Sequence, residues 1–145
     1  QIGILNTQTI LAHPEDVIAL RWVDENLPED ATIAVNSWRW LGETWAAADG
    51  GAWLLPMTAR SASTPPIDHI YNPDLFREVR EFNQAATAVS DWSDPLQAEW
   101  LREQGISHIF AGKKGGFFDP AVLMRNPKVE MLYGRHGVFI FALGD

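Results

Sequence analysis

The sequence contains no cysteine, and this absence excludes disulfide bonds, thiolate metal ligands and cysteine nucleophiles. Long hydrophobic runs are also missing: the longest near the C-terminus, residues 138–143, spans six residues, whereas a membrane helix needs roughly 20. No Gly-x-Ser-x-Gly elbow occurs, so Ser–His hydrolysis has no local support. Basic residues are few, and the net charge is −8. An acidic chain is a poor match for nucleic acid, because that binding depends on neutralising phosphates.

The remaining composition is that of a soluble globular domain. A chain of 145 residues, 46% hydrophobic and 21% charged, is long enough to bury one core. We expect residues 13–145 to form this single domain. Residues 1–12 carry no helix-start signal, and we expect them to be a lead-in segment or tether. The chain begins at Gln1 and not at Met, which suggests a piece of a longer protein.

Helix-start signals recur along the chain. Proline follows His13, Asn72, Asp94 and Asp119, and a proline at the first helical position costs no hydrogen bond. The pattern predicts helices over residues 14–27, 73–89, 95–105 and 120–126. Short apolar runs predict strands at 32–35, 52–55, 106–111, 129–133 and 138–143, the last two joined as a hairpin.

This alternation of helices and strands predicts the fold class. We expect one α/β layered domain with a mixed, mostly parallel sheet of four or five strands, flanking helices and a C-terminal β-hairpin. The clearest right-handed crossover unit leads from strand 106–111 through the helix at 120–126 to strand 129–133.

Tryptophan is concentrated in one stretch. Four of the seven tryptophans, Trp38, Trp40, Trp45 and Trp53, lie within residues 37–53, which follow neither a helical nor a strand period. A proline-rich stretch follows, so we expect an irregular insertion at about 37–73. Indoles bury much apolar surface, and each carries an N–H that needs a partner. We favour a role as hydrophobic filling for this insertion.

A binding role for the same cluster is the alternative interpretation. Tryptophan faces stack on sugar rings, and such sites place acids beside the indoles. This alternative predicts a carbohydrate-binding surface that uses the four tryptophans together with Asp49, and Arg60 stacks on or pairs with the same region. The candidate binding residues are therefore Trp38, Trp40, Trp45, Asp49, Trp53 and Arg60.

An enzymatic alternative rests on three polar residues. Asp49, Asp68 and His69 lie in the irregular middle of the chain, and they would form the cleft of a small independent α/β hydrolase or transferase if they converge. Their spacing does not force convergence, so we predict no catalytic residue, no metal site and no cofactor for this domain. The Gly-rich basic stretch 112–116 lacks the order of a phosphate loop, and we interpret it as a flexible basic loop.

Three segments together resemble a known kind of domain. They are residues 22–35, with a helix ending in Asn-Leu-Pro before a strand; 49–58, with Gly-Gly-Ala-Trp; and 101–110, with Leu-Arg-Glu-Gln-Gly-Ile-Ser-His. This succession, followed by the closing hairpin, resembles the soluble C-terminal domain of bacterial polytopic membrane proteins of the glycosyltransferase-C type. The resemblance spans roughly residues 14–143, and its motifs are packing and turn patterns.

The resemblance implies a function as well as a fold. It implies a non-catalytic accessory domain on the extracytoplasmic side of the cell membrane, because the catalytic acids of such enzymes lie in loops between membrane helices. The implied partner is the membrane-embedded part of the same polypeptide, with a glycan or a lipid-linked sugar as a further partner and no nucleic acid. The domain would position the acceptor, bind glycan or stabilise the membrane part.

Overall fold

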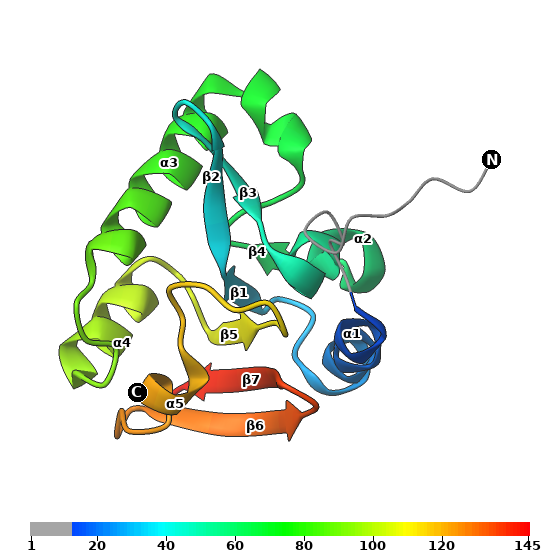
Figure 1. Ribbon diagram of the computed structural model, residues 1–145, viewed down its shortest axis with the longest axis vertical. Coiled ribbons are helices and arrows are strands. Elements are labelled where there is room, and N and C mark those ends of the chain that lie inside the picture. The colour runs from blue at the N-terminus through cyan, green and yellow to red at the C-terminus, as the bar shows by residue number, and fades with distance from the viewer. Residues whose placement is uncertain (1–12) are drawn as a thin grey trace.

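The computed structural model describes residues 13–145, and the predicted lead-in segment 1–12 lies outside the described residues. Its centre is a five-stranded mixed sheet in the order β4-β1-β5-β7-β6 (Figure 1). Four strands run in one direction and the fourth in the order, β7, runs against its two neighbours. The strands are β4 (Ser61–Ala62), β1 (Thr32–Val35), β5 (His108–Ala111), β7 (Val138–Leu143) and β6 (Val129–Arg135). The predicted α/β class with a C-terminal hairpin is confirmed.

The four predicted helices form where the proline signals place them. They are α1 (Pro14–Asn26), α3 (Pro73–Ala88), α4 (Pro95–Glu103) and α5 (Pro120–Leu123). At three of their starts a side-chain oxygen accepts a hydrogen bond from a free backbone N–H: Asn72 caps α3, Asp94 caps α4 and Asp119 caps α5. Such caps satisfy donors that a helix leaves unpaired in its first turn.

Helices cover both faces of the sheet, so the domain has three layers. Strand side chains alternate between the faces. Ile33, Val35 and Phe110 pack with Leu20 and Val23 of α1 in one hydrophobic cluster. On the opposite face, the second cluster joins strand side chains to residues of α3, α4 and α5: Ala34, Ile109, Phe141, Ala86, Leu101 and Leu123. Full burial of one such large side chain contributes about 1.5–3 kcal/mol, so these two layers hold the sheet between them.

The Trp-rich stretch differs most from expectation. Instead of an irregular insertion, residues 37–47 form an antiparallel hairpin of β2 (Ser37–Leu41) and β3 (Thr44–Ala47), which packs against α3 (Figure 1). The predicted strand at 52–55 is wrong, because those residues belong to the 3-10 helix η2 (Asp49–Trp53) and the short helix α2 (Leu54–Thr58). A further 3-10 helix, η3 (Ile67–Tyr71), leads into α3.

The sheet order also refines the predicted crossover. Strands β5 and β6 belong to one sheet as expected, but β7 lies between them and pairs with both. The edge strand β4 was not predicted, and it pairs in parallel with β1. Its two residues are too few to produce a recognisable alternation of apolar and polar side chains.

Candidate functional site

The segment between β1 and α3 carries most of the exposed apolar side chains. Nine of the thirteen large hydrophobic residues that are exposed within residues 13–145 lie in this segment: Trp38, Trp40, Leu41, Trp53, Leu55, Met57, Ile67, Ile70 and Tyr71. Scattered exposed apolar residues are ordinary on a protein surface, whereas a contiguous apolar patch marks an interaction site, and this segment is the candidate to form one.

Three of the four clustered tryptophans are half exposed. The exposed fraction is 42% for Trp38, 52% for Trp40 and 42% for Trp53. Only Trp45 is buried, with 5% exposed, and the guanidinium of its cross-strand neighbour Arg39 lies 5.7 Å from its ring centroid. The interpretation as hydrophobic filling is therefore confirmed for Trp45 and wrong for the other three indoles.

One of these indoles, Trp53, lines an apolar cavity of about 270 Å³. Its lining includes Ala46 of β3, Trp53 and Ile67, and no charged residue takes part in it. Trp38 is paired directly with Ala46 across the hairpin, so their side chains project from the same face of the hairpin. Trp53 thus lines the cavity itself, whereas Trp38 lies on the same hairpin face as Ala46, which also lines it. We call Trp38, Trp40, Trp53 and Ile67 the aromatic surface.

Asp49 lies apart from the aromatic surface, at the carboxyl ends of β1 and β5. Only 1% of Asp49 is exposed, and its backbone is left-handed, with φ of 53°. Its Oδ2 accepts a hydrogen bond from the backbone N–H of Gly115 at 3.1 Å, while its Oδ1 has no partner within residues 13–145. Burial raises the pKa of Asp49, and the nearby carboxylate of Asp16 raises it further.

Asp16 and Asp49 together hold the Gly-rich loop 112–116. The fully buried Asp16 accepts hydrogen bonds from the backbone N–H groups of Lys113 at 3.3 Å and His13 at 2.9 Å. The carboxyl ends of parallel strands are where α/β proteins commonly bind anions. Here two of the loop N–H groups donate instead to the carboxylates of Asp16 and Asp49, so these two groups are not free to bind an anion.

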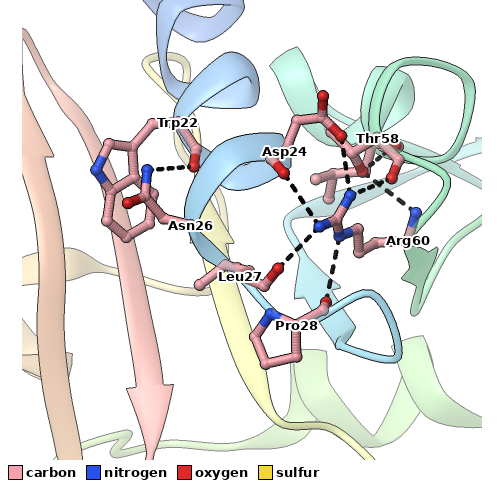
Figure 2. A network of polar contacts seen from close by, with 8 residues as sticks. Trp22, Asp24, Asn26, Leu27, Pro28, Thr58 and Arg60 are labelled. Atoms are coloured by element: carbon pink, nitrogen blue, oxygen red, sulfur yellow. Dashed lines mark hydrogen bonds and ion pairs between the residues drawn. The ribbon is translucent and has the colours of Figure 1, made fainter.

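Arg60 lies at the C-terminal end of α1 and supports the fold there (Figure 2). All five N–H donors of its buried guanidinium are used. They donate to the Asp24 carboxylate at 2.9 Å and to four backbone carbonyl oxygens, those of Asp24, Leu27, Pro28 and Thr58. The guanidinium thus satisfies carbonyls that α1 leaves unpaired at its C-terminus, and no donor remains for a ligand.

The enzymatic triad does not assemble. No hydrogen bond or ion pair between any two of Asp49, Asp68 and His69 occurs within residues 13–145. Asp68 is exposed, and His69 is buried with Nδ1 placed 3.0 Å from the carbonyl oxygen of Pro66. General acid–base catalysis needs groups within hydrogen-bond reach of one another and of a substrate. The part of the chain that the structure describes also holds no group of three His, Asp or Glu side chains able to bind a metal ion.

Sequence reasoning did not identify Asp16 and Asn36 as partners of the loop. The side-chain oxygen of Asn36, directly after β1, accepts a hydrogen bond from the backbone N–H of Phe118 at 2.7 Å. This bond joins the segment that follows loop 112–116 to the end of β1. Asp16 and Lys113 are separated by 97 positions, and Asn36 and Phe118 by 82. No local pattern reports contacts of that separation, and Asp16 looks in sequence like any acid in the first turn of a helix.

Comparison with protein-family models, with curated proteins and with solved structures finds no match to this chain. The resemblance to the glycosyltransferase-C type therefore stays a prediction, and functional inference depends on the site geometry. From His13 onward, no helix combines the length and the apolar character that crossing a bilayer requires.

Proposed function

We propose that this is a non-catalytic domain that binds carbohydrate through the aromatic surface. The observation that carries the proposal is the half-exposed Trp53, which lines an apolar cavity, together with the half-exposed Trp38 on the same hairpin face as Ala46, another residue of that lining. Two indoles that remain half exposed present flat apolar surface to a ligand, and the rigid side chain of Trp loses little conformational freedom on binding.

The chemistry of a sugar fits this surface. The C–H face of a pyranose ring is apolar and covers an indole, while its hydroxyls need polar partners at the rim. Of the charged residues on the hairpin, Arg39 projects with Trp45 from the face opposite to Trp38, and Glu43 accepts a hydrogen bond from Gln84 of α3, so the surface offers a sugar chiefly its apolar face. The cavity, at about 270 Å³, lies just below the usual range for small-molecule pockets, so it suits one ring of a longer ligand.

The wider setting follows from the sequence resemblance. We propose that the domain is accessory to a glycosyltransferase-like membrane protein, on the extracytoplasmic side of the cell membrane. In that setting its partners are the membrane-embedded part of the same polypeptide and a glycan or lipid-linked sugar. Of the predicted binding residues, the exposed Trp38, Trp40 and Trp53 are the ones that we assign to ligand contact; Trp45, Asp49 and Arg60 are buried and support the site or the fold.

Titration of the domain with a panel of soluble oligosaccharides, followed by tryptophan fluorescence and calorimetry, tests the proposal. Trp38→Ala and Trp53→Ala should each weaken binding by about 5- to 30-fold, because truncation of an aromatic anchor costs roughly 1–2 kcal/mol. Leu96→Ala removes another exposed apolar side chain, on α4, and serves as the matched control with unchanged affinity.

Two results would contradict the carbohydrate proposal. One is an absence of binding across the panel at millimolar concentration. The other is binding that Trp38→Ala and Trp53→Ala leave unchanged. Flotation with neutral phosphatidylcholine vesicles completes the design, because association with vesicles in place of sugars would assign the aromatic surface to a lipid interface.

A further inference from the structure

A second and larger cavity adjoins the apolar one, with Pro65 in the lining of both, but it contains none of the residues of the aromatic surface. It is an open groove of about 510 Å³ between α3, α4 and the starts of β1 and β5. Thr32 and Ile106 mark those strand starts, so the groove is at the opposite end of the parallel strands from Asp49. In Figure 1, α3 and α4 lie next to one another along one side of the sheet. A groove of this volume holds several side chains of a ligand.

The charge of the groove has one sign. Glu78, Glu81 and Glu103 line it, and its lining contains no Lys, Arg or His. All three glutamates are exposed, and within residues 13–145 none of them takes part in an ion pair. By contrast, Glu15 and Glu99, which lie outside the groove, are each paired with a lysine. Three uncompensated carboxylates around one groove attract a cationic partner.

An aromatic wall accompanies this charge. The rings of Phe82 and Trp100 both line the groove and stack on one another, with centroids 5.4 Å apart and planes 15° apart. Both side chains are half-buried, so part of each remains accessible. A guanidinium group can bind both parts of such a site, because it stacks on aromatic rings and donates paired hydrogen bonds to carboxylates.

We propose that this groove binds an extended, arginine-bearing segment of a partner protein. The volume exceeds what a single ion fills, and the open shape suits an extended chain. Ala62 of the edge strand β4 also lines the groove, so an extended segment runs beside a strand that pairs on one side only. The proposal does not depend on carbohydrate binding, since the aromatic surface shares none of the groove's glutamates.

The test uses an acetylated and amidated peptide in which arginine alternates with alanine, measured by calorimetry and by NMR shift mapping on the domain. The arginine peptide should bind and shift the amides of Glu78, Trp100 and their neighbours. The same peptide with citrulline, a neutral isostere of arginine, should not bind. A triple variant should weaken binding about tenfold, which is the combined effect expected when three exposed ion pairs with the peptide are lost. Its substitutions are Glu78→Gln, Glu81→Gln and Glu103→Gln.

A second triple variant provides the matched control. Glu25→Gln, Glu29→Gln and Glu130→Gln change the net charge by the same amount at exposed positions outside the groove, and should leave the affinity within twofold. Because all six positions are exposed, both triple variants should fold, which circular dichroism checks. Equal losses in the two triples, binding of the citrulline peptide, or shifts confined to another surface would overturn the proposal. Tighter binding by spermine than by the peptide would also overturn it, in favour of a small polycation.

Discussion

Replacement of Arg60 by methionine tests how the C-terminus of α1 is stabilised. Methionine keeps much of the buried volume but removes all five donors, so the carbonyl oxygens of Asp24, Leu27 and Thr58 lose their partner, whereas that of Pro28 keeps the backbone N–H of Ala31. The carbonyls of Leu27 and Thr58 accept fully buried hydrogen bonds, and leaving each unpaired costs about 1–3 kcal/mol. Water reaches the partly buried carbonyl of Asp24 and reduces the cost of leaving it unpaired. We expect Arg60→Met to lower the free energy of unfolding by about 4 kcal/mol.

The ion pair with Asp24 should account for little of this loss. Although Arg60 is buried, the Asp24 side chain is 55% exposed, so solvent screens the pair and we expect it to contribute about 1 kcal/mol. Asp24→Asn, which removes the charge and keeps an oxygen acceptor, is therefore the control.

Urea and thermal unfolding provide the assay. Arg60→Met should lower the Tm by on the order of 10 °C for a domain of this size. This loss should persist in 0.5 M salt, which screens surface charges. If Asp24→Asn cost as much stability as Arg60→Met, or if salt removed the difference, the claim that Arg60 stabilises the fold by pairing backbone carbonyls would be refuted.

Two further substitutions examine loop 112–116, and a third examines the hydrogen bonds that join Asn126 to the segment before α4. The raised pKa of Asp49 means that folding favours its protonated form. Its contribution to stability therefore falls as the pH rises from the pKa of the unfolded state through the pKa of the folded state. In urea unfolding, Asp49→Asn should be more stable than the wild type at pH 7.5, and the difference should be smaller at pH 4. Gly112→Ala should destabilise by about 1–3 kcal/mol in the same assay, because its Cβ would overlap the side chain of Asp49, whereas Gly144→Ala should change stability little. Asn126→Ala leaves the carbonyl of Trp92 without its donor, and thermal unfolding should show a loss of about 2 kcal/mol.

The aromatic surface could be predicted only in part. The sequence shows the concentration of tryptophan, but not which indoles face solvent. In β2 four of the five residues are exposed, from Trp38 to Leu41, so no buried face imposes the alternation that normally identifies a strand. Trp45 is buried because β3 packs against α3, a contact between segments far apart in the chain.

Local chemistry determined the elements that the sequence by itself predicts. A proline after Asn72, Asp94 or Asp119 begins a helix because the cap and the fixed proline φ act within a few residues. The apolar run 138–143 is a strand because both of its faces are covered. These signals were sufficient for the α/β class, since alternating helices and strands leave few ways to bury both faces of a sheet.

The tertiary structure decided everything that depends on contacts between distant positions. Only the fold inserts β7 between β5 and β6, closes loop 112–116 onto Asp16 and Asp49, and brings Arg60 to the end of α1. It also places the glutamates of α3 and α4 around one groove. Such juxtapositions arise from the packing of whole layers, and packing free energy is a property of the assembled core that no local run of residues encodes.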